Sequence, residues 1–434
     1  MKRSLFIAII FLFPLSAVYT DDMYPNIALI QTDADNQMIM GVTEKAAANI
    51  FYQTHPDIYD FLIFYHTFTP QLNMQQGLLI TYTVTGIGRE GYNPTGPASA
   101  WGSGGRLMGG ARMCHIDQYP DDPDSNMPFP LGGLTSTELL AHEMSHYWFA
   151  AMEYKKEGMA DNHPGFRGCE GNSGENGACS PNQHWSYYFN SGPSVMYGSD
   201  ITDNGDGTFT FTHSSPRKYS PFDQYVMGFR APGEVGELFY LCDYADESMC
   251  KEGNPALPTP HTAAPDTVSG KTKIAFTIDD VIRAMGERVP SSTDAPKHFN
   301  VGFIMVSKPG FVPFPQQLEK LEKIRVRFQE WFTWATDGRA TICTELDGDC
   351  ESTETPDDDD PVIDEDSVVT EDNTVIPDEE VTPDESVTDN TVTPDESASQ
   401  DEQTVQDDNT ETPDNSTEQP ADEEDVGCGC TIVF

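Results

Sequence analysis

Two histidines and a glutamate in the segment His142-Glu143-Met144-Ser145-His146 have the types and spacing of a metal-dependent hydrolytic site. Residues four apart on a helix project from the same face, so His142 and His146 are placed to bind one metal ion. Glu143 stands beside the first histidine and is placed to take a proton from a water that the metal polarises. The pattern therefore predicts zinc as the metal and Glu143 as the general base.

A helix must position these side chains, and the sequence marks where that helix begins. Thr135 and Glu138 fit a capping box, in which each side chain accepts a hydrogen bond from the other residue's backbone. Neither Gly nor Pro follows until Gly158, so nothing before that residue is expected to break the helix.

The chain up to about Thr344 has globular composition and mixes helix signals with strand signals. Segments rich in β-branched and aromatic residues, or lying directly upstream of the motif helix, predict strands at 57–69, 77–85 and 111–117. Further expected elements are helices at 43–54, from Ser220-Pro221 onward and at 315–334, and a hairpin at 204–212. This mixture predicts an α+β domain.

The chain begins like an exported protein. Lys2 and Arg3 precede an almost wholly apolar run at 5–18, and small residues favour cleavage near Thr20. The run is short for a membrane span, and no later segment approaches the length that a span needs. We therefore expect residues 1–20 to be a signal peptide, and the mature protein to be secreted or held at the cell surface without a transmembrane span.

The net charge of −47 is distributed very unevenly. Residues from Glu351 onward hold 30 of the 71 acidic residues and none of the 24 basic ones, which leaves −17 for the rest. Imperfect repeats such as VTPDES recur at 375–397 within the Thr-, Pro-, Asp- and Glu-rich residues 351–426, and this composition predicts a disordered acidic stalk. No basic face is left to neutralise phosphates, so nucleic acid is not an expected partner. The terminal segment 427–434 contains Cys428 and Cys430 and is similar to short bacterial sorting tags, which predicts anchoring at the cell surface.

Nine cysteines in an exported chain favour disulfides. Three pairs lie close in sequence, namely Cys169/Cys179, Cys242/Cys250 and Cys343/Cys350, whereas Cys114 has no near neighbour. A thiolate zinc site is the rival interpretation of the short pairs, but the chain lacks the Cys-x-x-Cys spacing of such sites.

The segment LLAHEMSHYW resembles the active-site helix of the zincin metallopeptidases. Further blocks, GRLMGGARMCHI, HWSYYFNSGPSVMYG, YSPFDQYVMGF and RFQEWFTWATDGRA, resemble a family of secreted bacterial HExxH proteins. The likeness covers most of residues 45–345. It implies a zincin-like domain at 21–345 with a mixed twisted sheet, and an endopeptidase that acts on proteins or peptides. It also implies that a sheet-edge strand, at 111–116 or 77–85, pairs with the extended substrate.

The third metal ligand is not given by the motif. A metzincin would have Gly and His where Phe149 and Met152 stand, so that pattern is absent. However, Ser194-Val195-Met196-Tyr197 resembles a metzincin Met-turn and follows His184 at a short interval, which favours His184 as the third ligand. The main competitor is Asp223, although its position after Ser220 and Pro221 is also that of a capping carboxylate. The remaining alternatives are Glu153, Glu157, His163 and Glu170.

Two further questions stay open at the level of sequence. Tyr147, Tyr197 and Tyr225 are candidate donors to an oxyanion, and the sequence does not choose among them. The rival function is a non-catalytic surface protein that keeps a zincin fold for binding or adhesion. Glu143 favours catalysis, because a binding protein has no use for a general base.

Overall fold

The computed structural model describes residues 18–35, 41–80, 84–87, 96–128, 133–148, 152–169, 181–192, 194–212, 216–250, 267–346 and 350. All of them belong to one compact unit. Most of the expected signal peptide, the acidic stalk and the cysteine tag lie outside the described residues. Among the described residues, no helix combines the length and apolar character needed to cross a bilayer.

The first of two sheets has a core of four parallel strands. Its order is β1 (Val18–Asp21), β2 (Tyr24–Gln31), β13 (His298–Ser307), β3 (Phe61–His66), β5 (Gly109–His115) and β4 (Gln76–Ile80), with β14 (Thr341–Cys343) beside β13. Strands β2, β13, β3 and β5 are parallel, whereas β4 runs antiparallel to β5 and ends the sheet. All six residues of β3 are buried, as expected for a central strand covered on both faces.

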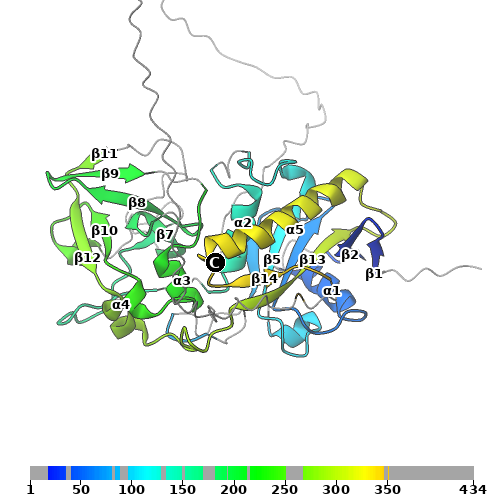
Figure 1. Cartoon of the computed structure of the whole chain (residues 1–434), viewed down its shortest axis with the longest axis horizontal. Helices are drawn as coiled ribbons and strands as arrows, with labels where there is room; N and C mark the ends of the chain where they lie inside the picture. The colour runs from blue at the N-terminus through cyan, green and yellow to red at the C-terminus, as the bar shows by residue number, and fades with distance from the viewer. Residues whose placement is uncertain are drawn as a thin grey trace, which may run out of the picture. The chain divides into compact units, whose positions relative to one another are not determined.

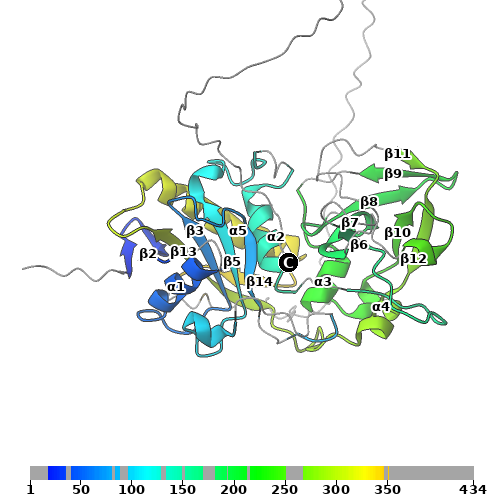
Figure 2. The ribbon, with the colours of Figure 1, turned by 180° about the vertical axis from the view of Figure 1, so that it is seen from behind.

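Helices cover both faces of this sheet (Figures 1 and 2). Alternate residues of β3 enter two different cores: Phe61 and Ile63 pack with α2 (Ser136–Ser145) and α5 (Pro315–Ala335), whereas Leu62 and Phe64 pack with α1 (Val42–Phe51). Helix α5 matches the predicted 315–334 within one residue, and its buried stripe includes Leu321 and Phe328. The segment His142–His146 therefore lies on the α5 side of the sheet.

The second sheet was not expected from the sequence, apart from one hairpin. Its order is β11 (Thr267–Ser269), β9 (Thr208–Thr212), β8 (Tyr197–Asp203), β7 (Pro181–Asn190), β10 (Leu238–Cys242) and β12 (Thr272–Phe276), with β6 (Arg167–Cys169) beside β7. The predicted hairpin at 204–212 is confirmed, since β8 and β9 pair antiparallel and residues 204–207 form the turn between them. Helices α3 (Pro221–Met227) and α4 (Ile278–Met285) accompany this sheet (Figure 1).

The described part of the chain is thus a mixed α+β structure with five α-helices and two mixed sheets, which confirms the broad fold class. Several elements are shorter than predicted. Helix α1 ends at Phe51 and not at residue 54, because His55 precedes a proline and is disfavoured in helical conformation. Helix α2 ends at Ser145, although the next Gly or Pro is Gly158.

Two of the three predicted disulfides are present, Cys242–Cys250 and Cys343–Cys350. The third predicted pair is Cys169–Cys179, and its Cys179 lies outside the described residues. Cys114 is buried near the end of β5.

Candidate metal centre

Helix α2 is fixed at its start and buried along its whole length. Both hydrogen bonds of the predicted capping box are present: Glu138 N donates to Thr135 Oγ1 at 3.1 Å, and Thr135 N donates to Glu138 Oε2 at 2.9 Å. All ten residues of the helix are buried. Side chains on such a helix are held in place by packing on every side, which suits a site that needs fixed geometry.

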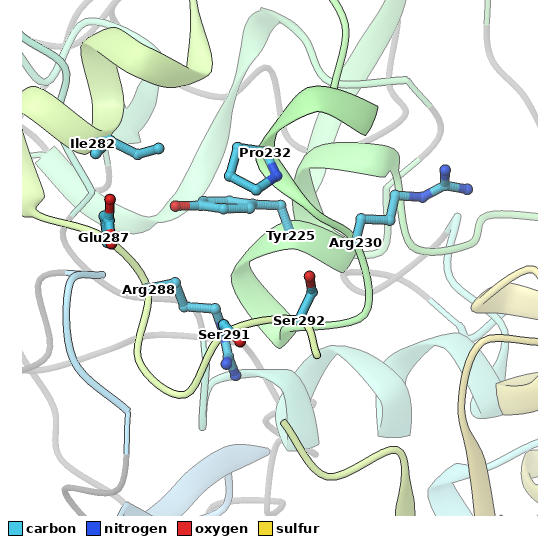
Figure 3. Close-up of a pocket in the computed structure, with 8 residues that line it drawn as sticks. All are labelled: Tyr225, Arg230, Pro232, Ile282, Glu287, Arg288, Ser291 and Ser292. Atoms are coloured by element: carbon cyan, nitrogen blue, oxygen red, sulfur yellow. The ribbon is translucent and has the colours of Figure 1, made fainter. Parts of the chain in front are cut away.

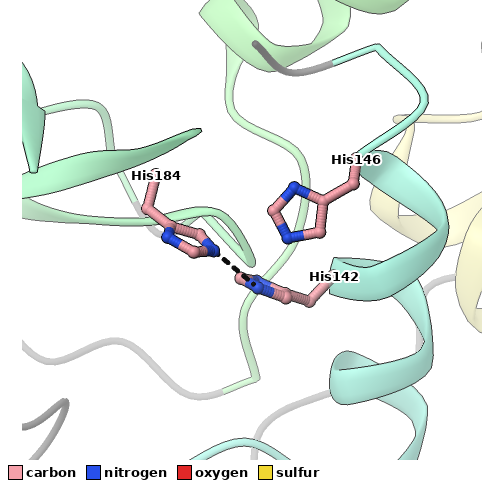
Figure 4. Close-up of side chains that lie close together, drawn as sticks. All are labelled: His142, His146 and His184. Carbon is pink, nitrogen blue, oxygen red and sulfur yellow. Dashed lines mark hydrogen bonds between the residues drawn. The ribbon is translucent and has the colours of Figure 1, made fainter. Parts of the chain in front are cut away.

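Three histidines converge at the end of this helix (Figure 4). His142 and His146 come from α2 and its C-cap, and His184 comes from β7 in the second sheet. One nitrogen from each of the three rings lies within 4.8 Å of the others, and all three residues are buried. The structure thus brings His184 to the pair that the sequence motif supplies.

The geometry of these rings fits a shared metal ion. His142 Nε2 lies 3.1 Å from His184 Nε2, close to the ~3.3 Å that separates two nitrogens bound tetrahedrally to one zinc at about 2.0–2.1 Å. His142 Nδ1 lies 2.7 Å from the carbonyl oxygen of Val195, which only accepts, so Nδ1 carries the proton and Nε2 keeps its lone pair. Burial, together with the nearby His184 and Arg217, lowers the pKa of His142 to about 3. The ring is therefore neutral at physiological pH, as a metal ligand must be.

The turn Ser194–Tyr197, compared above with a Met-turn, contacts the group through Val195 and Tyr197. Val195 supplies the carbonyl that orients His142. The ring of Tyr197 lies 5.0 Å from that of His142 and 5.1 Å from that of His184, measured between centroids. Met196 is fully buried, and its carbonyl accepts a hydrogen bond from Trp185 N at 2.9 Å. The turn therefore holds the rings of two candidate ligands and the strand that carries one of them.

Asp223 does not belong to the group, and it serves as a brace beside it. Its Oδ1 accepts from Trp185 Nε1 at 2.7 Å, and its Oδ2 accepts from Ser220 N at 2.8 Å in a capping box for α3. A hydrogen bond from Ser194 also reaches this carboxyl group, whose pKa burial raises to about 6. Asp223 thus ties together α3, the residue after His184 and the turn at Ser194.

The other alternative ligands are also separate from the group. His163 faces the carbonyl of Glu247 through Nε2 at 2.9 Å and accepts from Gly165 N through Nδ1. Glu157 is exposed, Glu153 is half-buried outside the group, and Glu170 lies outside the described residues. Among the described His, Cys, Asp and Glu residues, the three histidines are the group with metal-binding geometry.

Of the three tyrosines considered as oxyanion donors, Tyr197 lies against the candidate ligands, as described above. Tyr147 packs its ring against Phe61. Tyr225 lines a separate pocket of about 220 Å³, where its hydroxyl points toward Glu287 (Figure 3). In that pocket Arg288 donates from Nε and Nη2 to the carbonyls at the end of α3, so its guanidinium caps the helix.

A close approach between β4 and α2 was not foreseen. A Cβ placed on Gly77 would lie 2.7 Å from His146 Cβ and 2.8 Å from the Glu143 carbonyl oxygen. The strand therefore passes directly against the motif, and only glycine leaves enough room. Of the two strands considered for substrate pairing, β5 lies inside the sheet and β4 ends it. A glycine within a strand pattern is the one sequence signal that pointed to this contact.

Arg217 was also missed, and it joins the helix to the turn. Its backbone N–H donates to Glu138 Oε1 at 2.5 Å, and its Nη1 donates to the Ser194 carbonyl at 2.8 Å. Nothing in the local sequence around Arg217 indicates this role, because both partners are remote in the chain.

No family model, no curated protein and no solved structure matches this chain, so its function must be inferred from these residues themselves.

Proposed function

We propose that this chain is an exported zinc-dependent endopeptidase. Its metal ligands are His142, His146 and His184, and its general base is Glu143. The observation that carries the proposal is the convergence of three buried imidazoles beside the glutamate of the motif. Three protein ligands with a fourth position left for water or substrate are typical of catalytic zinc sites, whereas structural sites use four protein ligands.

The chemistry divides among a few residues of the chain. Zinc, when bound, lowers the pKa of a water molecule and polarises the carbonyl to be attacked. Glu143 follows His142 on α2, where its carboxylate would accept the proton of an attacking water and pass it to the leaving amine. The Val195 carbonyl keeps His142 in the tautomer that presents Nε2 to the metal. Tyr197, beside two of the ligands, is the candidate donor to the developing oxyanion.

The position of β4 supports an extended peptide as substrate. This strand ends the first sheet and contacts the motif helix at Gly77. An exposed strand edge binds extended peptides through backbone hydrogen bonds, so it fits substrates of varied sequence. A sheet-edge strand upstream of the motif helix that pairs with the substrate is also what the resemblance to zincins implies. We therefore assign peptide binding to Gln76–Ile80 and not to the strand at 109–115.

Metal content and hydrolysis together test the proposal. The purified protein is expected to hold close to one zinc per chain by elemental analysis and to digest denatured casein. Glu143→Gln is expected to keep the zinc and lose activity by about three orders of magnitude or more, since only the base is removed. Glu157→Gln, at an exposed glutamate, is the matched control and should change neither quantity.

Two outcomes would count against it. Full zinc occupancy in the wild-type protein without hydrolysis of casein or of a broad peptide library would favour a non-catalytic binding or adhesion protein. Loss of zinc in Glu143→Gln as large as the loss of activity would mean that Glu143 supports the metal and is not the base.

A further inference from the structure

The loop between β13 and α5 exposes an unusual concentration of large apolar side chains. Phe311, Val312 and Phe314 are 67%, 67% and 69% exposed. They make up three of the eight exposed large hydrophobic residues in the described part of the chain, and they fall within four consecutive positions. Single exposed apolar residues are common on protein surfaces, but a contiguous group marks an interaction site.

Side-chain and backbone hydrogen bonds hold this loop in one conformation. Gln31, at the end of β2, bonds it twice: Gly310 N donates to Gln31 Oε1 at 3.2 Å, and Gln31 Nε2 donates to the Phe311 carbonyl at 2.7 Å. Phe311 N donates to the Lys308 carbonyl at 3.0 Å. The apolar side chains are therefore presented by a braced turn, and little conformational entropy remains to be lost on binding.

The loop also has few backbone donors left to satisfy. Phe314 N donates to Gln317 Oε1 at 3.0 Å, and the Gly310 and Phe311 donors are bonded as described. Three of the seven residues from 309 to 315 have no N–H at all, because they are Pro309, Pro313 and Pro315. Val312 is left as the one donor of the loop without an acceptor among the described residues. An apolar medium penalises every unpaired donor, so this loop is suited to such a medium.

We propose that the loop at residues 309–315 inserts its apolar tip into the interfacial region of a lipid bilayer. The tip is a projecting turn, and burial of Phe311, Val312 and Phe314 at the boundary of headgroups and acyl chains removes their apolar surface from water. This role is independent of the proposed peptidase activity. It would hold the protein at a membrane surface without a spanning helix.

Charge selects the kind of bilayer. The chain before the acidic stalk carries a net charge of −17, and Lys308, the cation nearest the tip in sequence, is paired with Asp35 at 3.2 Å. The loop therefore lacks the basic cluster that attracts anionic headgroups. We expect binding to zwitterionic vesicles, and weaker binding when anionic lipid is added.

Flotation of the full-length mature chain with phosphatidylcholine vesicles tests the proposal. The wild-type protein is expected to float with the vesicles. The double variant Phe311→Ser with Phe314→Ser is expected to lower the partition coefficient by about tenfold or more, because two large apolar groups are lost. Tyr244→Ser, at a 52% exposed aromatic residue in the second half of the domain, is the matched control and should bind like the wild type.

A spectroscopic variant separates insertion from adsorption. In Phe314→Trp, brominated phosphatidylcholine should quench the added fluorescence beyond the level of the wild-type protein, whose five tryptophans give the background. Vesicle binding without that quenching would overturn insertion. A wild-type protein that does not float, or a double variant that floats equally well, would also overturn the proposal and leave a protein partner as the occupant of the loop.

Discussion

The two faces of the first sheet each bury a group of ionisable side chains, and the two groups differ in whether they contain opposite charges. On the α1 side, Glu44 accepts from Arg112 at 2.6 and 2.7 Å, and His66 Nε2 lies 3.1 Å from the same carboxylate. On the α2 side, His142 and His184 face each other through their Nε2 atoms, and no carboxylate belongs to the group. One group contains its own counter-charges, whereas the other consists of three imidazole rings with one nitrogen of each directed at a common point.

This difference distinguishes a structural cluster from a candidate metal site. Burial alone would raise the pKa of Glu44, but the charge of Arg112 and hydrogen bonds from His66 and Arg112 hold it well below its ordinary range. That cluster is complete within the fold and fixes α1 to β3 and β5. The three histidines instead bring one ring nitrogen each to within 4.8 Å of the others, which is an arrangement that a metal cation would complete.

The largest effect is expected from His184→Ala. Removal of one of three ligands should lower zinc affinity by several orders of magnitude and abolish hydrolysis, as measured by chelator competition and by casein digestion. His163→Ala is the matched control, because His163 is also buried but bonds to Glu247 and Gly165. Unchanged zinc affinity in His184→Ala would show that the second sheet contributes nothing to the metal centre.

Glu44→Gln, unlike His184→Ala, should lower the stability of the fold and leave zinc binding unchanged. It leaves the Arg112 guanidinium buried without its counter-charge, so the free energy of unfolding should fall by about 3–5 kcal/mol in denaturant titrations. Zinc bound per folded chain should stay the same, since Glu44 is on the other face of the sheet. A loss of zinc comparable to that in His184→Ala would break the proposed separation of the two groups.

The pH dependence of unfolding gives a second test of the role of Glu44. Because the folded-state pKa of Glu44 lies below the ordinary glutamate value of 4.5, its stabilisation is complete above 4.5 and is lost as the pH falls toward the folded pKa. Acid unfolding of the wild-type protein should therefore include a component below pH 4.5 that Glu44→Gln lacks. Parallel acid-unfolding curves for the two proteins would contradict the assignment.

A smaller effect is expected from Gly77→Ala, which acts on the metal side of the sheet alone. The added Cβ would meet His146 and the Glu143 carbonyl, so the strand and the helix must move apart. A displacement of this kind should reduce kcat/KM for peptides by about 10- to 100-fold. Gly233→Ala, where a Cβ meets nothing within 4 Å, should retain full activity. Full activity in Gly77→Ala would remove the strongest support for β4 as the substrate strand.

The smallest effect is expected from deletion of residues 351–434. The deleted part contains neither group, and its composition predicts no packing on the domain. Thermal unfolding and casein digestion should match the full-length protein, while the truncated chain should be released from the cell surface if the cysteine tag anchors it. A clear drop in the unfolding temperature would mean that the stalk contacts the domain.

Sequence alone predicted the parts of the site that depend on local spacing. The capping box and the four-residue interval fixed the helix and placed His142, Glu143 and His146 on it. His184 was inferred from its residue type and from the turn at Ser194–Tyr197 that follows it, because its approach depends on a second sheet of which the sequence predicted only one hairpin. The role of β4 depends on strand order, which local sequence does not contain.

The remaining contacts escaped because their partners are distant in the chain. Arg217 reaches Glu138 and Ser194, and Asp223 reaches Trp185, across separations that no short pattern encodes. Asp223 illustrates the difficulty, since its capping position was recognised while its bond to the neighbour of His184 was not. Short-range rules identified the role of a residue within its own helix. They did not identify its hydrogen bonds to residues that are distant in sequence.

The orientation of His142 depends on a main-chain atom, the carbonyl oxygen of Val195. A point mutation at position 195 leaves this acceptor in place, so apolar residues that fit the fully buried space of Val195 should keep the ring oriented. An insertion or deletion of one residue between 190 and 198 would move the carbonyl away and release the ring. In a mutational scan, a change of length in this segment should therefore cost more zinc affinity than an apolar replacement of Val195 that fits the same space.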